Sequence, residues 1–339
     1  MSRSLTTVII LRVVQQVSCP AMNKNRFVVG VDGGGSKTVA LIADESGRIH
    51  GRGESGSSNY HNVGADAAGG AIKKAVKEAR IQAGLGGKFL STSVVALAAI
   101  DCSNDKKIAQ RFVQKTSIAR KNFVVHDSIA AIYASTRGEP GVIVNSGTGS
   151  VAAGINRHGQ YARAGGWGYI LDDEGSGYDI GRKGLNYAFK SLDGRVPATK
   201  LVTIFKRFFG VKNLEDALER IYTDGLTVEE IAHLAPFVSK AAHNDQVSRQ
   251  IVRAAGVELA KLVCAVSRQL RMTNERFTVT IVGGSFKSGR NLLRPFEASI
   301  KKECPHVRIN KLKIEPVNGA VLLALSVLHN GEDVIRKLQ

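Results

Sequence analysis

Apolar runs of strand length and segments of helical periodicity alternate along the chain from residue 27 onward. The first three runs predict a meander of antiparallel strands joined by tight turns, at Phe27–Asp32, Thr38–Ala43 and Arg48–Gly53. Other apolar runs predict strands at Val94–Ile100, Phe123–Val125, Val142–Val144, Val151–Ile155, Gln160–Ala164 and Thr278–Val282. Helical spacing predicts helices at Ala65–Ala83, Lys106–Arg120, Ser128–Ser135, most of Asp179–Leu270, and Asn318–Leu328.

One unit of this pattern, strand, glycine-rich turn and strand, occurs twice. It covers residues 27–43 and returns at 142–155, more than 110 residues later. A spacing that long indicates two domains of similar topology, which also suits 339 residues. We therefore expect an α/β fold with an N-terminal domain at 26–139 and a C-terminal domain at 140–339. Residues 1–25 are expected to be an extension, and the last helix, about 319–338, to pack back on the N-terminal domain.

Composition excludes some classes of protein and leaves one question about charge. An apolar fraction of 43% with 22% charged residues is globular, and no apolar run reaches the roughly 20 residues of a membrane-spanning helix. The net charge of +18 is compatible with a nucleic-acid partner, but no basic run and no zinc-finger spacing accompany it. We therefore interpret it as a solvated basic surface. The four cysteines form no metal-ligand pattern and are expected to be reduced thiols.

The first glycine-rich turn carries the residue types that bind phosphate and a divalent cation. Glycines let backbone N–H groups approach anionic oxygens closely, and a carboxylate at a strand end can hold Mg²⁺ through water. The alternative is a glycine-rich hairpin with a purely structural turn. The spacing matches neither the P-loop nor the dinucleotide-binding fingerprint. The candidates are Asp32 for the metal and Gly33, Gly34, Gly35, Ser36, Lys37 and Thr38 for phosphate.

Two later turns repeat this chemistry. The second lies at Asn145–Ser150 and offers Ser146, Gly147, Thr148 and Gly149 as further phosphate contacts. The third, Ile281–Ser285, follows a strand and precedes a helix, so that Gly283, Gly284 and Ser285 are candidates to contact a nucleoside. Each turn alone is a weak signal, and the three in this order are a stronger one.

This order of motifs resembles a known superfamily. Asp32–Thr38, Asn145–Ser150 and Val282–Ser285 are similar to the phosphate-1, phosphate-2 and adenosine motifs of the actin–hexokinase–Hsp70 ATPases. Gly165–Gly168 and Asp173–Ser176 resemble the GGWG and DEGS blocks of the N-acetylglucosamine kinase branch of the BadF/BadG-type ATPase family. The resemblance covers about residues 27–330.

The resemblance implies a fold and an activity. The fold would be two ribonuclease-H-like, actin-like ATPase domains with an interdomain cleft. The activity would be transfer of the γ-phosphate of ATP, with Mg²⁺, to a hydroxyl of a hexose or N-acetylhexosamine, by family precedent the 6-hydroxyl. It further implies a cytoplasmic homodimer whose partners are ATP and a monosaccharide, with no nucleic acid and no membrane.

The resemblance also assigns site residues. Asp127 would be the catalytic base, and independent reasoning agrees, because Asp127 follows a strand and opens a helix whose N–H groups and dipole favour the ionised form. The alternative is that Asp127 only caps that helix. The residues that would contact the sugar are Ser58, Asn59, Asp127, Gly165, Asp173 and Glu174. The single tryptophan, Trp167, is expected to be packed.

Some alternatives stay open from the sequence. Ala98 stands where some members of the branch carry a Ser-Gly-Gly segment, which removes a hydroxyl contact and leaves glucose, glucosamine or a broad hexose range as substrates. An activator ATPase of the BadF/BadG type and a sugar-sensing regulatory protein are the other functions considered. Against these, no cysteine lies near a glycine pair, and the N-terminal extension is too short for a helix-turn-helix.

Overall fold

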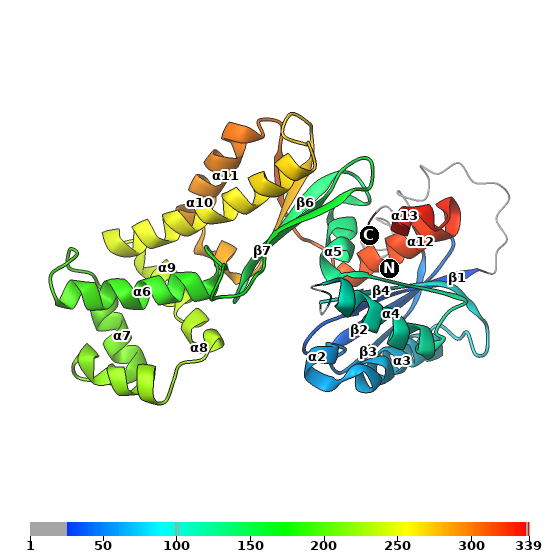
Figure 1. Ribbon diagram of the computed structural model, residues 1–339, viewed down its shortest axis with the longest axis horizontal. Coiled ribbons are helices and arrows are strands. Elements are labelled where there is room, and N and C mark those ends of the chain that lie inside the picture. Colours follow the sequence, from blue (N-terminus) through cyan, green and yellow to red (C-terminus); the bar gives the residue numbers. More distant parts are fainter. Residues whose placement is uncertain (1–25, 99, 101, 337, 339) are drawn as a thin grey trace, which may run out of the picture. The chain divides into compact units, whose positions relative to one another are not determined.

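The computed structural model describes residues 26–98, 100, 102–336 and 338, so the expected extension at 1–25 lies outside the described residues. The described chain divides into two compact units (Figure 1). The first unit contains the residues up to Gly141, the segment Ile155–Tyr161 and the residues from Leu312 onward. The second unit contains Val142–Gly154 and Ala162–Lys311.

The first unit is built from one five-stranded sheet and the helices around it. Its elements are β1 (Phe27–Gly33), β2 (Thr38–Asp44), β3 (Ile49–Ser55), α2 (Tyr60–Val63), α3 (Ala65–Gln82), β4 (Leu90–Leu97), α4 (Ser103–Thr116), β5 (Lys121–His126), α5 (Asp127–Thr136), α12 (Pro316–Asn330) and α13 (Asp333–Arg336). The strand order is β3-β2-β1-β4-β5, in which β1–β2 and β2–β3 are antiparallel and β1–β4 and β4–β5 are parallel.

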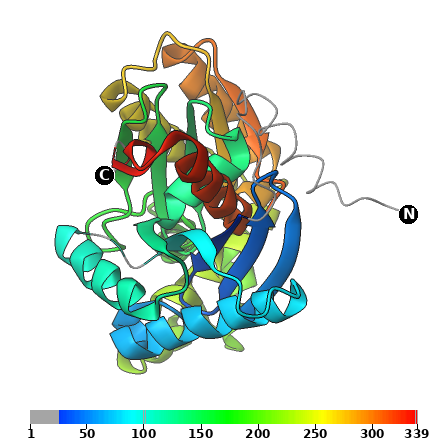
Figure 2. The ribbon, with the colours of Figure 1, turned by 90° about the vertical axis from the view of Figure 1, so that its right-hand side faces the viewer.

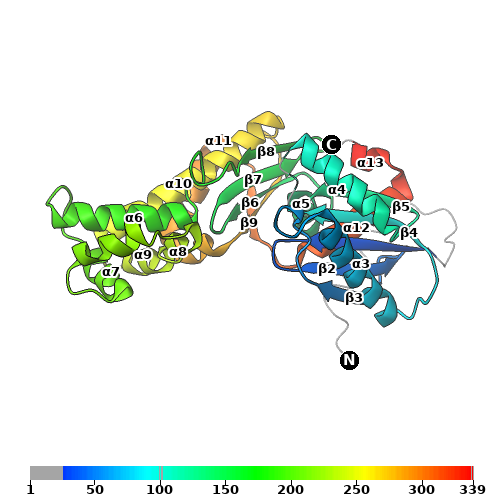
Figure 3. The same ribbon diagram turned by 60° about the horizontal axis from the view of Figure 1, so that its bottom comes forward.

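Alternation along β1 places different helices on the two faces of this sheet. Val29 and Val31 belong to the core formed with α3 and α4, and α3 lies across β2 and β3 (Figure 3). Gly30 lies between these two valines, so it faces the opposite side of the sheet. A Cβ at this position would lie 2.4 Å from the backbone nitrogen of Val321 in α12. Helix α12, drawn in red in Figure 2, is therefore in direct backbone contact with the central strand.

Helix α12 is enclosed because it is apolar on nearly every side. Ten of its residues are buried, the pattern of a helix that lies inside a fold. It crosses α5 so closely that a Cβ on Gly319 would lie 1.8 Å from the carbonyl oxygen of Ala130. Glycine at this position is what permits the two backbones to touch.

The second unit repeats the topology of the first. Its sheet has the order β10-β9-β6-β7-β8, which becomes the order of the first sheet when β6, β7, β8, β9 and β10 replace β1, β2, β3, β4 and β5. The predicted α/β fold of two similar domains is thereby confirmed. The elements are β6 (Gly141–Ser146), β7 (Ser150–Ile155), β8 (Tyr161–Gly165), α6 (Gly177–Leu192), α7 (Leu201–Phe209), η1 (Leu214–Ala217), η2 (Glu219–Thr223), α8 (Val228–Ala232), α9 (Ala235–Ala241), α10 (Gln246–Gln269), β9 (Thr278–Val282), η3 (Gly284–Ser288), α11 (Arg290–Glu303) and β10 (Arg308–Lys311).

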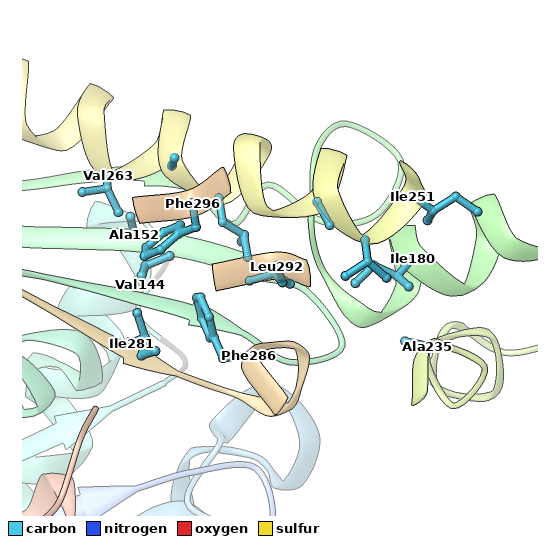
Figure 4. Packing of buried hydrophobic residues seen from close by; sticks show 14 of the residues in the cluster. Val144, Ala152, Ile180, Ala235, Ile251, Val263, Ile281, Phe286, Leu292 and Phe296 are labelled. Atoms are coloured by element: carbon cyan, nitrogen blue, oxygen red, sulfur yellow. The ribbon is translucent and has the colours of Figure 1, made fainter. Parts of the chain in front are cut away.

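The core of the second unit links its sheet to α10, α11 and η3. Val144 of β6 and Ile281 of β9 belong to it, as do Phe286, Leu292 and Phe296 of the following segment (Figure 4). The rings of Phe286 and Phe296 meet edge to face with their centroids 5.5 Å apart. This packing fixes η3 beside the ends of β6 and β9, where the second and third glycine turns lie.

No helix in the described ranges is long and apolar enough to cross a membrane.

Candidate functional site

The first glycine turn is held in place by its own backbone and by residues 56–58. The N–H of Gly34 donates to the carbonyl of Lys37 over 3.0 Å, and Ser58 donates its N–H to the carbonyl of Gly34 over 3.2 Å. The hydroxyl of Thr38 donates to the carbonyl of Gly56 over 2.8 Å. Gly35, Ser36 and Lys37 remain exposed at the tip of the loop. The loop is thus ordered at its base and offers backbone N–H groups, a hydroxyl and an amine to a ligand.

Asp32, immediately before this turn, lies among other carboxylates. Burial, followed by the charges of Asp127 and Glu315, raises the pKa of Asp32 from 3.8 to about 6, against the lowering effect of Lys37. Glu315 precedes α12 and forms an ion pair with Arg52 over 2.8 Å. Within the described ranges no group of three or more His, Cys, Asp or Glu side chains could hold a metal ion by itself.

Asp127 is the first residue of α5, as the sequence predicts. The N-cap of that helix is His126, whose Nδ1 accepts from the N–H of Ser128 over 3.1 Å. The interpretation of Asp127 as the N-cap is therefore wrong. His126 Nδ1 also lies 2.8 Å from Asp127 Oδ1, and the side chain of Asp127 is 39% exposed. A carboxylate in the first turn of a helix, accessible to solvent and next to an imidazole, can accept a proton from a bound hydroxyl.

The raised pKa of Asp32 predicts an unusual effect on stability. A carboxyl with a pKa of about 6 in the folded protein holds its proton more tightly there than in the unfolded chain, so the free energy of unfolding falls as the pH rises from 3.8 to about 6. We expect Asp32→Asn, free of nucleotide and divalent cations, to be more stable than the wild type by about 3 kcal/mol above about pH 7. Urea unfolding at several pH values measures this difference, which should vanish below about pH 3. Lower stability of the variant at every pH would contradict the assignment.

The second glycine turn is fixed by the segment at residues 173–176. The carboxylate of Asp173 accepts the N–H of Ser150 over 2.7 Å, and the hydroxyl of Ser150 donates to the carbonyl of Glu174 over 2.9 Å. The hydroxyl of Ser146 donates to the carbonyl of Gly175 over 2.9 Å. Asp173 is buried and has a positive φ of 71°, and burial followed by the charge of Asp172 raises its pKa, against the lowering effect of the Ser150 N–H. Two motifs that are separate in sequence form one structure here.

The third glycine turn lies against the second. Gly283 has a φ of 106°, and a Cβ there would lie 2.2 Å from the carbonyl oxygen of Ser146. A pocket of about 510 Å³ opens beside this contact. Gly147, Thr148, Gly284 and Ser285 line it together with residues of α8, α9 and η3. Residues predicted to contact phosphate and residues predicted to contact a nucleoside thus line one pocket.

The pocket contains the predicted Ser285 and also side chains that the sequence did not predict. The hydroxyl of Ser285 is buried without a hydrogen-bond partner, so it is available to a ligand. The hydroxyls of Ser239 and Ser288 are 2.7 Å apart at its wall. Lys240 and His243 also line it. These residues of α9 and the turn after it belong to no motif, and only the fold brings them to the glycine turns.

The predicted sugar contacts are distributed over both units. Ser58, Asn59 and Asp127 belong to the first unit. Ser58 is buried with an unpartnered hydroxyl, and Asn59 caps α2 by accepting the N–H of His61 over 3.1 Å. Gly165, Asp173 and Glu174 belong to the second unit, where only Glu174 is exposed.

The packing expected for Trp167 is wrong. Its side chain is 68% exposed, and the guanidinium of Arg163 lies 5.5 Å from the ring centroid. Gly166 and Gly168, with positive φ values of 76° and 86°, flank it in a loop that continues into the exposed Tyr169, Ile170 and Leu171. Because the loop turns outward at these glycines, the large ring is carried away from the core instead of into it.

Comparison with known proteins gives the family. The model of the BadF/BadG/BcrA/BcrD ATPase family matches residues 29–324, most of the chain and both units. The chain belongs to this family. The resemblance drawn from the glycine turns and the GGWG and DEGS blocks is thereby confirmed.

Two curated proteins that are similar in sequence to this chain are kinases. An N-acetylmuramic acid/N-acetylglucosamine kinase of Clostridium acetobutylicum is 34% identical over 302 residues, which cover 89% of this chain and 99% of the relative. An N-acetyl-D-glucosamine kinase of Dictyostelium discoideum is 30% identical over 317 residues, 90% of this chain and 99% of the relative. The prediction that this chain is an ATP-using kinase is confirmed by these relatives.

Solved structures agree on the fold. A candidate N-acetylglucosamine kinase from Chromobacterium violaceum superimposes with a TM-score of 0.68 at 25% identity, covering 88% of this chain and 99% of that one. A ROK family glucokinase from Streptomyces griseus gives a TM-score of 0.50 at 19% identity, over 88% and 98% of the two chains. The second likeness concerns the fold alone.

Proposed function

We propose that this protein transfers the γ-phosphoryl group of ATP to the 6-hydroxyl of an N-acetylated amino sugar, with N-acetylglucosamine as the preferred acceptor. The observation that supports this most directly is the placement of Asp127 and Asp32. The half-exposed carboxylate of Asp127 opens α5, and its charge contributes to the raised pKa of Asp32, a partly buried carboxylate near the end of β1. The kinase relatives, two of which act on N-acetylated amino sugars by name, favour the acceptor.

The second unit would bind the nucleotide. The pocket of about 510 Å³ beside Gly284 and Ser285 has the size of a small-molecule site and suits the base and ribose. The backbone N–H groups of Ser146–Gly149 and the hydroxyl of Thr148 at its edge suit the phosphates, while the hydroxyl of Ser146 already donates to Gly175. Asp173 acts here as a positioning residue, because its carboxylate fixes Ser150 at the end of that loop. In the first unit, Gly33–Thr38 offers the same phosphate-binding chemistry.

The carboxylates of the first unit fit a magnesium ion. Asp32 would hold it through water; its raised pKa reflects burial first and then two neighbouring carboxylates, whose repulsion a divalent cation would relieve. When bound, the ion supplies charge neutralisation for the phosphates during transfer. Asp127 would accept the proton of the sugar hydroxyl as that oxygen attacks the γ-phosphorus, while the bond from the γ-phosphorus to the β,γ-bridging oxygen breaks and ADP leaves.

Each unit offers polar side chains that suit a sugar. Asn59 uses its Oδ1 to cap α2, which leaves its amide nitrogen to donate to a sugar oxygen. The exposed carboxylate of Glu174 can accept from hydroxyls. Trp167 and Tyr169 offer exposed aromatic faces on the same loop as Gly165, suited to the apolar face of a sugar ring.

A panel of acceptor sugars tests the proposal. ADP release is measured in a coupled assay with N-acetylglucosamine, N-acetylmuramic acid, N-acetylmannosamine, glucosamine, glucose and mannose. We expect kcat/KM for N-acetylglucosamine to exceed that for glucose about tenfold or more. The position of the phosphate in the product is read by phosphorus–proton NMR.

Two results would contradict the proposal in different ways. A preference for glucose would show that the alanine at position 98 has removed the acetamido selectivity, which overturns the acceptor but keeps the kinase. Absence of ADP release with all six sugars, in protein that binds a non-hydrolysable ATP analogue, would overturn the sugar kinase itself.

A further inference from the structure

A groove on the first unit carries positive charge that the proposed kinase site does not use. It has a volume of about 800 Å³ and is lined by α4, by β5 and by residues 332 and 335 of the last segment. Lys107, Arg111 and Lys115 line it from α4. They are four residues apart in succession, which places all three on one face of the helix.

These cations have no acidic partner in the described part of the chain. No ion pair of the described residues involves Lys107, Arg111 or Lys115, whereas Arg268, Lys183 and Lys261 elsewhere each pair with a carboxylate within 2.9 Å. The one acid that lines the groove, Glu332, lies 2.8 Å from Lys121. The stripe on α4 therefore keeps its full positive charge.

Such a stripe costs helix stability in the absence of a ligand. Like charges four residues apart destabilise a helix. α4 contains two such pairs, Lys107 with Arg111 and Arg111 with Lys115. A bound anion would relieve both.

The other residues that line the groove suit a small polar ligand. Gln110 offers an amide beside the cations, and Phe123, Val124 and Ile335 form an apolar wall. Gln114 is already committed, since its amide donates to the carbonyl of Asn122 over 3.0 Å and ties α4 to β5. A concave site with apolar walls, a few polar groups and this volume is typical of small-molecule binding. The guanidinium of Arg111 presents the planar fork that phosphate oxygens accept in pairs.

We propose that this groove binds a small phosphorylated anion, a sugar phosphate or an inorganic polyphosphate, at a second site that uses none of the residues assigned to the kinase reaction. Two or more negative charges on one phosphorylated group match three cations on one helix face. The amide of Gln110 and the apolar wall would contact the rest of the molecule.

Calorimetric titration of the full chain tests this site. Mg²⁺ and a non-hydrolysable ATP analogue are kept saturating, so that the glycine turns are occupied, and the probes are inorganic pyrophosphate, glucose 6-phosphate and citrate. The variant is Lys107→Gln/Arg111→Gln/Lys115→Gln. The matched control is Lys73→Gln/Lys74→Gln/Lys77→Gln, which removes the same charge from exposed positions of α3.

We expect saturable binding of at least one phosphate probe, weakened about tenfold or more in the α4 variant and unchanged in the α3 control. Tighter binding of glucose 6-phosphate indicates a sugar phosphate, and tighter binding of pyrophosphate a polyphosphate. The proposal is overturned if neither phosphate probe binds saturably, if both variants lose binding equally, or if citrate binds as tightly as the phosphates. Displacement of the phosphate probes by an oligoglutamate peptide of higher affinity would overturn it in favour of a protein-docking surface. We also expect kcat of the α4 variant to equal that of the wild type, so that loss of probe binding in the groove can be told apart from damage to the kinase site.

Discussion

Replacement of Asp127 by asparagine is expected to lower turnover by at least ~100-fold while nucleotide affinity stays the same. The amide is the same size as the carboxylate but cannot accept the proton of the sugar hydroxyl, so the attacking oxygen must lose it without help. The side chain is half-exposed at the start of α5, so the substitution leaves no cavity in the core. The nucleotide pocket belongs to the other unit and keeps all of its lining residues.

Turnover is measured by coupled ADP release, and nucleotide affinity by titration of a non-hydrolysable ATP analogue. The matched control is Asp66→Asn, because Asp66 is also an exposed acid in the first turn of a helix, α3, but lies outside every motif. The control is expected to keep wild-type turnover. Turnover near that of the wild type in Asp127→Asn would remove this residue from the role of base.

Replacement of Gly319 by alanine is expected to destabilise the protein by about 3 kcal/mol or more. The added methyl group would lie 1.8 Å from the carbonyl oxygen of Ala130 and 2.6 Å from the backbone nitrogen of Ala134. These atoms are backbone atoms of α5 and cannot rotate away, so α12 must move as a whole. α12 also touches Gly30 of the central strand, and the displacement would therefore reach the end of β1, where Asp32 lies.

The midpoint of urea unfolding measures this effect. Gly70→Ala is the matched control, since Gly70 is also a helical glycine but has nothing within 4 Å of its would-be Cβ. The control should be neutral or more stable by up to about 1 kcal/mol, because alanine has the higher helix propensity. Equal midpoints for Gly319→Ala and the wild type would show that α12 and α5 leave room for a methyl group between them, which contradicts the close contact of Gly319 with Ala130.

Local sequence pattern was enough to predict most strands and the positions of all three glycine turns. Strand β9 occupies the predicted residues 278–282. The start of β4 was missed by four residues, at Leu90 instead of Val94, because the polar Ser91, Thr92 and Ser93 interrupt the apolar run, although Thr92 and Ser93 pair with both β1 and β5. This polar segment is a strand because it pairs with two neighbouring strands, which its amino-acid composition does not indicate.

Contacts between distant segments could not be predicted in the same way. Asp173 is an acid in an acidic, glycine-rich stretch, and nothing local indicates that its carboxylate is buried against Ser150. Glu315 stands before a proline and a helix, which is an ordinary helix start, and only the fold brings its charge near Asp32. The short strand β10, with a single partly buried residue among exposed ones, lacks the apolar run that would reveal it.

The packing of α12 on β1 has a consequence for the order in which the protein is completed on the ribosome. One face of the first sheet is covered by a helix that is made only after the whole second unit. Until Pro316–Asn330 have emerged, the surface around Gly30 and the inner side of α5 remain uncovered. The unit that is synthesised first is therefore finished last, and its exposed apolar face is the part of the nascent chain most in need of protection from aggregation.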